Sequence, residues 1–263
     1  MVKRGRMLGA AVRIYKDTRK KHDLVFNVYV MRPVAAAVVA VAARTPATPN
    51  QLTLLNLFVF LVAAVLLVAM PTFAGGLVAI AVLEVSYCLD CADGMLARHK
   101  KIASKEGHLF DFFTDEVKAV LLAAVLGVRL YRMGGFGIDA QAWPPNDVRF
   151  LFGAIAGSVI LASAISLTNF VRRPELSGRE STVEAHYETV VEAKPVTPIG
   201  RVVRGVQTFL RFLNHYPSHI WAFALAGRLD VFFWVYAAIN LLYLARGWLG
   251  IILRFGRFGR PAR

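Results

Sequence analysis

The sequence predicts an all-α integral membrane protein of six transmembrane helices, with an interfacial amphipathic helix on the cytoplasmic side before the first of them. Three observations support this fold class. Of the 263 residues, 57% are hydrophobic and only 18% are charged, which is unusually apolar for a soluble domain. Four nearly uncharged runs have about the 20 residues that a helix needs to cross a bilayer. The basic residues gather in segments that six crossings would place on one side.

The first 49 residues are expected to lie outside the bilayer core. Residues 1–23 form a basic segment, and residues 24–49 form an interfacial helix and a turn. Pro33 to Ala43 is apolar for only about three helical turns between two arginines, which is too short to span and suits a helix on the membrane surface. The prolines of "RTPATPN" then disfavour helix, and Thr48 or Asn50 can cap the first transmembrane helix.

The six-helix domain is expected over residues 50–253. Four of its spans are strongly apolar, at residues 52–70, 72–89, 150–171 and 231–253. The third and fifth spans are less apolar, because residues 110–128 contain several charges and residues 209–227 begin with polar side chains. A cytoplasmic loop at residues 172–205 belongs to this domain, and a basic cytoplasmic tail at residues 254–263 follows it.

The net charge of +14 would also fit a nucleic-acid-binding protein, but the position of the charges favours the membrane. Lysine and arginine gather near both termini and in the loops after the second and fourth spans. This is the positive-inside distribution. We therefore expect a multi-pass protein of the cell (inner) membrane, with both termini and any active site in the cytoplasm and no nucleic-acid partner.

Four aspartates interrupt the apolar pattern. Asp90 and Asp93 lie near the end of the second span and Asp111 and Asp115 at the start of the third, so each pair occupies one helix face. A short loop joins the two spans, which places both pairs at the same depth. Unpaired carboxylates are costly there, and a cluster of carboxylates is the ligand set that Mg²⁺ prefers. Two ions sharing such ligands would suit attack at phosphorus.

Small residues beside these aspartates leave room for a bulky group between the helices. Together they form the spacing Asp90-x-x-Asp93-Gly94-x-x-Ala97-Arg98, followed after eight residues by Gly107-x-x-x-Asp111-x-x-x-Asp115. This spacing resembles the signature of the CDP-alcohol phosphotransferases, also called CDP-alcohol phosphatidyltransferases. With the expected spans and the "TPNQLT" that starts the first of them, the resemblance extends over about residues 24–253.

The resemblance implies a phospholipid-biosynthetic transferase. Such an enzyme moves a substituted phosphate group from a CDP-alcohol, commonly CDP-diacylglycerol, to the hydroxyl of an acceptor alcohol and releases CMP. It also implies a homodimer in the bilayer and two Mg²⁺ or Mn²⁺ ions per active site. The four aspartates would hold the metals, and Asp115 would also be the general base. The residues implied to contact CDP are Gly94, Ala97, Arg98, Ser104, Gly107, Asn50 and Thr53.

The substrates stay open at this stage. Arg172 and Arg173 end the fourth span and could bind the phosphate of an acceptor such as inositol phosphate or glycerol phosphate, although they also suit membrane anchors. The amino-terminal segment is also similar to choline and ethanolamine phosphotransferases, which combine a CDP-linked small alcohol with diacylglycerol. More remote alternatives are a UbiA-type prenyltransferase, a cation transporter and a catalytically inactive relative. The complete signature, its interfacial position and the lack of a sequence repeat weigh against these three.

Overall fold

The computed structural model describes residues 2–19, 23–177, 205, 208–210 and 212–253. Its amino-terminal part consists of helix α1 (Val2–Asp17), a π-helical turn (Asn27–Met31) and helix α2 (Arg32–Ala42). The segment expected to form an interfacial helix is therefore helical. The amino-terminal basic segment is also helical over α1, which the sequence did not predict.

Three long helices follow, joined by short turns: α3 (Pro49–Ala69), α4 (Phe73–Lys100) and α5 (Lys105–Met133). Thr48 caps α3, because its hydroxyl accepts from the backbone N–H of Gln51 while the Gln51 side chain accepts from the backbone of Thr48. Thr72 and Ser104 cap α4 and α5 through single side-chain acceptors. These caps fix where each helix begins, and with it the register of the residues that face one another.

The rest of the chain contains a small hairpin, two further long helices and several short pieces. In chain order these are β1 (Gly135–Phe136), β2 (Ala142–Trp143), α6 (Arg149–Arg172), α7 (Pro174–Ser177), a 3₁₀ turn (Tyr216–Ser218), α10 (Ile220–Leu225) and α11 (Leu229–Ile252). The two strands pair antiparallel. The part of the expected loop 172–205 beyond residue 177 lies outside the described residues, as does the tail 254–263.

Among the described residues, four helices are long and apolar enough to cross a membrane: α3, α4, α6 and α11. Large apolar side chains such as Leu54, Phe58 and Val65 are exposed on α3, as expected for a surface that contacts lipid rather than water. The mostly helical fold is consistent with the predicted all-α membrane protein, and four of the six expected spans coincide with helices that are long and apolar enough to cross a membrane.

The other two expected spans are not confirmed. Helix α5 covers the third and exceeds the needed length, but its charged residues exclude it from the apolar set. The fifth, in its described part from residue 212, is not one continuous helix, because a 3₁₀ turn with Pro217 precedes the six-residue α10. Proline removes a backbone donor and so disfavours an uninterrupted helix at this point.

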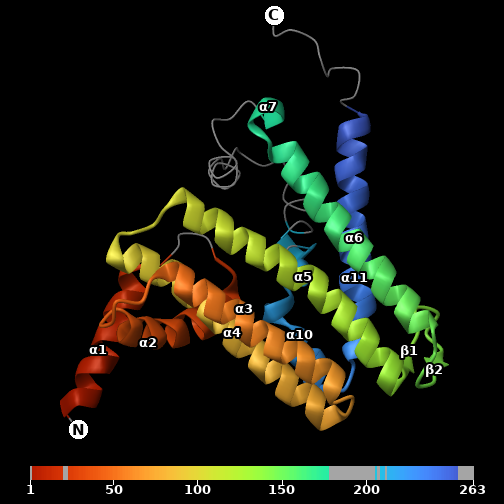
Figure 1. Ribbon diagram of the computed structural model, residues 1–263, viewed down its shortest axis with the longest axis horizontal. Helices are drawn as coiled ribbons and strands as arrows, with labels where there is room; N and C mark the ends of the chain where they lie inside the picture. The colour runs from red at the N-terminus through yellow and green to blue at the C-terminus, as the bar shows by residue number, and fades with distance from the viewer. Residues whose placement is uncertain (1, 20–22, 178–204, 206–207, 211, 254–263) are drawn as a thin grey trace, which may run out of the picture.

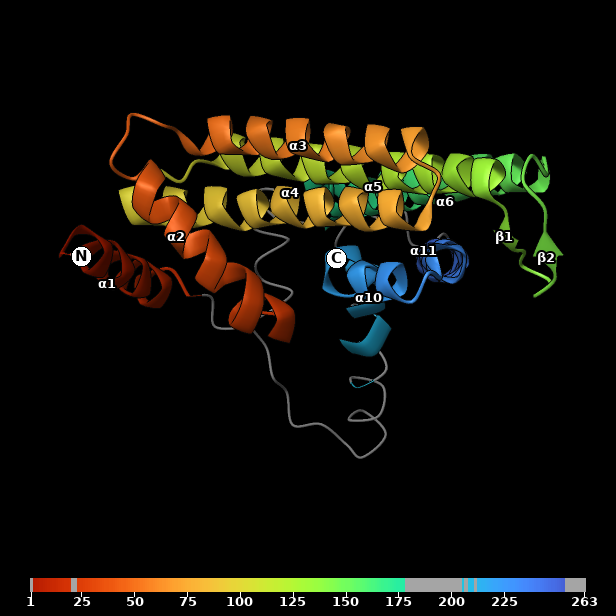
Figure 2. The same ribbon diagram turned by 90° about the horizontal axis from the view of Figure 1, so that it is seen from below.

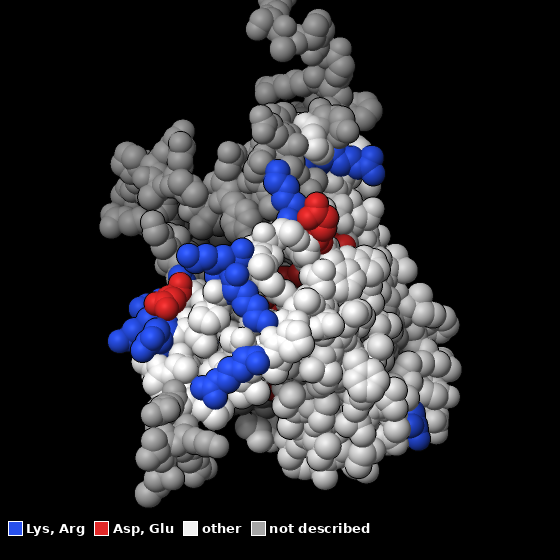
Figure 3. All heavy atoms as spheres, turned by 60° about the vertical axis from the view of Figure 1, so that its left-hand side comes forward, with Lys and Arg blue, Asp and Glu red and all other residues white. Residues whose placement is uncertain are grey.

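The long helices converge towards the end of the molecule that bears the β hairpin and fan apart towards the other end (Figure 1). Helices α3, α4 and α5 run side by side, while α2 crosses below α4 (Figure 2). Lysine and arginine gather mainly over one part of the surface in Figure 3, and a few acidic atoms lie recessed among the surrounding uncharged residues. Two cavities, described below, are lined by residues near the carboxyl end of α4 and the amino end of α5.

A buried arginine of α5 hydrogen-bonds to the turn between α3 and α4, at the end of the molecule near the β hairpin. Arg129 of α5 is only 2% exposed, and its guanidinium donates to the carbonyl oxygens of Leu67 (3.1 Å), Met70 (2.8 Å) and Thr72 (2.5 Å). Helix ends leave such carbonyls without helical partners, so Arg129 supplies the donors that the turn between α3 and α4 needs.

We expect Arg129→Met to lower the unfolding free energy by about 3 kcal/mol, because it strands three carbonyl groups in an apolar setting. The measurement is the thermal unfolding midpoint of the detergent-solubilised protein. Arg132→Met is the matched control: Arg132 also donates to a backbone carbonyl, that of Val68, but is exposed, so its loss should be much smaller. Equal midpoints for the two variants would contradict this role.

Candidate active site

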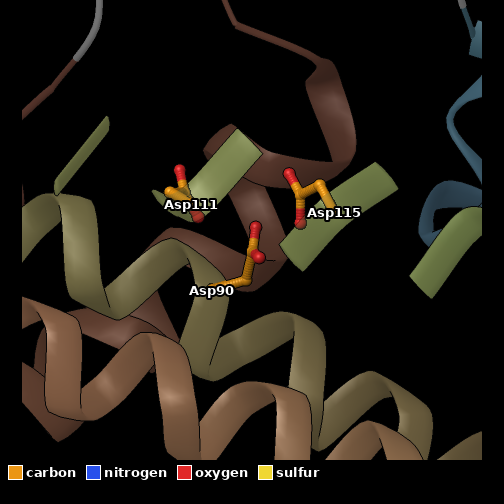
Figure 4. Close-up of side chains that lie close together, drawn as sticks. All are labelled: Asp90, Asp111 and Asp115. Atoms are coloured by element: carbon orange, nitrogen blue, oxygen red, sulfur yellow. The ribbon is translucent and has the colours of Figure 1, made fainter. Parts of the chain in front are cut away.

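Three of the four predicted aspartates come together between α4 and α5. Asp90 extends from α4, and Asp111 and Asp115 extend from successive turns of α5. One oxygen of each carboxylate lies within 4.8 Å of an oxygen of the other two, and Figure 4 shows the three side chains around a common space. The i, i+4 spacing on α5 and the short α4–α5 connection bring them together, as the sequence predicted.

Asp93 lies beside this group and has its own partner. It is 3% exposed, and its Oδ2 accepts a 2.6 Å hydrogen bond from the hydroxyl of Thr53 on α3. Thr53 was expected to contact the nucleotide, and here it also orients one of the predicted metal ligands. Asp93 is therefore held by α3, while Asp90, three residues earlier, has partners on both α3 and α5.

A buried lysine to which the sequence pattern gave no role lies within the cluster. The Nζ atom of Lys118 is 2.7 Å from Oδ1 of Asp90 and 2.7 Å from Oδ1 of Asp115, and its side chain is 3% exposed. Asn56 of α3 donates a further 2.7 Å hydrogen bond to Oδ1 of Asp90. Lys118 follows Asp115 by three residues, so the same helical spacing that paired the aspartates would have placed it on their face.

A cavity of about 330 Å³ adjoins Asp93. Its lining includes every residue expected to contact CDP: Asn50, Thr53, Gly94, Ala97, Arg98, Ser104 and Gly107. Gly107 helps to keep it open, because a Cβ there would lie 3.1 Å from Oδ1 of Asn50, whereas a Cβ at Gly94 would meet the Arg98 guanidinium at an ordinary contact distance of 3.4 Å. Ser104 has a structural role as well, since its hydroxyl accepts from the Gly107 backbone and caps α5.

A larger cavity of about 500 Å³ lies on the other side of Asp93. Asp90, Asp111 and Asp115 line it, and the two cavities share a wall made of Asp93, Gly94, Arg98 and His108. The larger cavity also has a polar wall, formed by other segments, that the sequence did not predict. Residues of that wall are Asp23, Asn27, Arg32, Tyr87, Asn214 and His215.

Arg172 and Arg173, the expected acceptor-phosphate residues, are elsewhere. Both lie at the carboxyl end of α6, where Arg173 is exposed, and neither lines either cavity. The carboxyl-terminal part of α6 contacts a residue of the larger cavity through Asn169. The Asn169 amide donates a 3.0 Å hydrogen bond to Glu116, which lines that cavity. Their contact with an acceptor stays a prediction.

The donor set suits a hard divalent cation. Asp90, Asp111 and Asp115 offer only oxygen ligands, and mutual oxygen separations within 4.8 Å fit an ion that binds each ligand at about 2.0–2.1 Å, as Mg²⁺ does. Lys118 offsets only part of the negative charge, so the cluster retains an excess that a divalent ion would neutralise. The cluster can therefore hold a metal ion at the wall of the larger cavity, close to Asp93, which lines both cavities.

Comparison with known proteins agrees with this geometry. The family model described as CDP-alcohol phosphatidyltransferase matches residues 46–236, the central region of the chain. None of the curated proteins compared matches the chain. The matched region contains all four aspartates, the whole smaller cavity and most of the larger one. Members of this family transfer substituted phosphate groups and generally use divalent metal ions. The chain belongs to the CDP-alcohol phosphatidyltransferase family and is an enzyme that transfers substituted phosphate groups.

Proposed function

We propose that this enzyme serves phospholipid biosynthesis by moving a substituted phosphate group from a CDP-alcohol, first of all CDP-diacylglycerol, to an acceptor alcohol, with release of CMP. The observation that carries the proposal is the pair of cavities that meet beside the aspartates. The smaller cavity is lined by every residue expected to contact CDP, and the larger one by Asp115. A donor in the first and an acceptor in the second would meet at the carboxylates.

Asp90, Asp93, Asp111 and Asp115 would hold two divalent ions, Mg²⁺ or Mn²⁺. Bound ions would neutralise the diphosphate of the donor and make CMP a better leaving group. Thr53 and Asn56 contribute by fixing the orientation of Asp93 and Asp90 through their hydrogen bonds. Arg98 lines both cavities and can bind a diphosphate oxygen through its planar guanidinium.

Asp115 would act as the general base. In the transfer, the acceptor oxygen forms a new P–O bond, the P–O bond to CMP breaks with its electron pair staying on CMP, and the acceptor proton passes to the Asp115 carboxylate. Lys118, at 2.7 Å from Asp115, holds this carboxylate in one orientation towards the cavity. Asp115 is also the aspartate of the cluster with the most exposed side chain, at 47%, which suits contact with an incoming hydroxyl.

For the membrane, we propose six crossings, made by the four apolar helices together with α5 and the segment 209–227. Helix α5 packs along α3 and α6, both apolar enough to span, which supports a path through the bilayer for α5 as well. The active site, both termini and the loop 172–205 would be cytoplasmic, and residues 24–49 would lie at the inner membrane surface. We also propose a homodimer, the assembly that the family resemblance implies.

The test is CMP release by the purified protein across a panel of CDP-alcohols and acceptor alcohols, with mass detection of the lipid product. We expect release to require a divalent metal, a CDP-alcohol and an acceptor. Asp90→Asn should raise the metal concentration needed for half-maximal release by about tenfold or more, because it removes a charged ligand shared by the cluster. CMP release that is absent with every pair, or that is indifferent to chelator, would disprove the proposal.

The same panel of substrates distinguishes the proposed function from the alternative, a choline- or ethanolamine-type phosphotransferase. A choline- or ethanolamine-type enzyme would use CDP-choline or CDP-ethanolamine with diacylglycerol as the acceptor. The polar wall of the larger cavity, with Asp23, Arg32 and His215, favours a polar acceptor over diacylglycerol. Product formed only from the small CDP-alcohols and diacylglycerol would establish the alternative.

A further inference from the structure

The first residue of α2, Arg32, reaches the larger cavity from the amino-terminal segment. It is only 4% exposed, and its Nε is paired with Oδ2 of Asp23, a carboxylate that is itself mostly buried. Asn27 donates a 2.9 Å hydrogen bond to the other oxygen of Asp23. The ion pair therefore fixes the guanidinium in one orientation at the cavity wall.

One arm of this guanidinium lacks a hydrogen-bond partner within the described part of the chain. Nη1 of Arg32 is buried without a hydrogen-bond partner among the described residues, and so is Oδ1 of Asn214 on the same wall. Leaving a charged donor unsatisfied in a buried site is costly. Since both atoms belong to residues that line a cavity large enough for a small molecule, a ligand that accepts from Arg32 and donates to Asn214 would offset that cost.

A chain of hydrogen bonds holds the polar side chains of the surrounding wall in place. Asn27 lies in a π-helical turn, a local distortion that often accompanies functional sites. Its Oδ1 accepts a 2.5 Å hydrogen bond from Tyr87, whose hydroxyl also contacts Nε2 of His215 at 2.9 Å. Nδ1 of His215 is in turn 2.6 Å from the Ser218 hydroxyl. This chain connects the amino-terminal segment, α4 and the 3₁₀ turn into one polar wall.

We propose that Arg32, positioned by Asp23, binds a phosphate group carried by the acceptor alcohol, and that Asn214 accepts from a hydroxyl of the same molecule. This inference rests on the proposed function and narrows its acceptor to phosphorylated polyols. A phosphate monoester offers acceptor oxygens and negative charge to Arg32, and a further hydroxyl would face the carboxylates across the cavity. Arg32 and Asp115 line the same cavity, so one bound molecule could offer its phosphate to Arg32 and its nucleophilic hydroxyl to Asp115.

The position of Arg32 indicates the acceptor rather than the donor. Arg32 lines the larger cavity but not the smaller one, where every residue expected to contact CDP is found. It also differs from Arg172 and Arg173, which line neither cavity. Substitutions at Arg32 and at Arg172 and Arg173 are therefore expected to affect the binding of a phosphorylated acceptor differently.

The first experiment measures binding without turnover. Isothermal titration of the purified, metal-loaded protein compares glycerol phosphate and inositol phosphate with glycerol and inositol. We expect Arg32→Gln to weaken binding of the phosphorylated alcohols by about 10- to 100-fold, the scale of a lost charge-assisted hydrogen bond, and to leave the plain alcohols unchanged. Arg44→Gln, an exposed position after the same helix, is the matched control and should change neither.

Two further variants keep the test decisive. Arg32→Lys retains a cation beside Asp23 but removes the second donor arm, so it should fold and still lose about tenfold in affinity for the phosphorylated alcohols. The double variant Arg172→Gln, Arg173→Gln tests the competing prediction from the sequence, and if Arg32 holds the phosphate it should lose much less affinity for the phosphorylated alcohols than Arg32→Gln does. If the double variant carries the loss and Arg32→Gln does not, or if phosphorylated alcohols bind no better than plain ones, the assignment is wrong.

Kinetics separate this inference from the proposed function. In CMP release, Arg32→Gln should raise KM for the phosphorylated acceptor by about 10- to 100-fold, with KM for the CDP-alcohol changed by less than about threefold. CMP release with unphosphorylated acceptors alone would overturn the inference and leave the proposed function intact. Binding of phosphorylated alcohols that depends on Arg32, without CMP release from any CDP-alcohol, would support the role of Arg32 and disprove the proposed function.

Discussion

Replacing Asp115 with asparagine should lower the rate of CMP release by about 10³-fold, within the range that a positioned general base contributes. The amide keeps the size and one oxygen of the side chain but cannot take a proton from the acceptor hydroxyl. The measurement is the single-turnover rate at saturating metal, donor and acceptor, so that a weakened metal site cannot account for the loss.

The Asp115→Asn variant should still bind the CDP-alcohol donor. Asp115 does not line the smaller cavity, so the affinity for CDP-alcohol should change by less than about tenfold in Asp115→Asn. Asp139→Asn is the matched control, since Asp139 is exposed in the hairpin, and it should turn over normally. Normal turnover in Asp115→Asn would remove this residue as the base, and loss of donor binding would assign it to the nucleotide site instead.

Replacing Lys118 with methionine should destabilise the metal-free protein and make it more responsive to metal. Methionine keeps the length of the side chain but removes the ammonium that contacts Asp90 and Asp115. Removing one partner of a buried charge pair costs about 3–5 kcal/mol, equivalent to about 5–10 °C in the unfolding midpoint of a chain of this size. A divalent ion binding to the folded state would replace the missing positive charge and restore much of this stability.

The measurement is the unfolding midpoint in chelator and in a Mg²⁺ or Mn²⁺ titration. We expect a lower midpoint in chelator, a larger increase with metal, and half-maximal stabilisation at a lower metal concentration than in the unmodified protein. Lys118→Arg, which keeps the charge, and Lys16→Met, at an exposed position of α1, are the controls. An unchanged response to metal would mean that the lysine and the ion do not share the same carboxylates.

The sequence predicted the chemistry of the site well because the relevant contacts are local. The aspartates lie three and four residues apart on two helices joined by a short loop, so helical periodicity alone brings Asp90, Asp111 and Asp115 together. The apolar helices α3, α4, α6 and α11 were predictable for a similar reason, since length and hydropathy identify a span without knowledge of its neighbours.

The parts that sequence reasoning missed depend on contacts between distant segments. Arg32 reaches the cavity because α2 packs against α4, and nothing in its local pattern distinguishes it from an arginine at a membrane surface. Asn27, Tyr87 and His215 come from three separate segments and form one hydrogen-bonded chain only in the fold. The break near Pro217 was also underestimated, because the apolar composition of residues 220–227 masked the 3₁₀ turn before it.

The wall shared by the two cavities has a consequence for any mutational study of this enzyme. Asp93, Gly94, Arg98 and His108 face both spaces, so changing one of them alters the surroundings of the nucleotide and of the incoming alcohol together. Apparent affinities for both substrates would then shift in concert and imitate cooperativity between them. Only positions that border a single space, such as Asn50 on one side and Arg32 on the other, can report on one substrate independently.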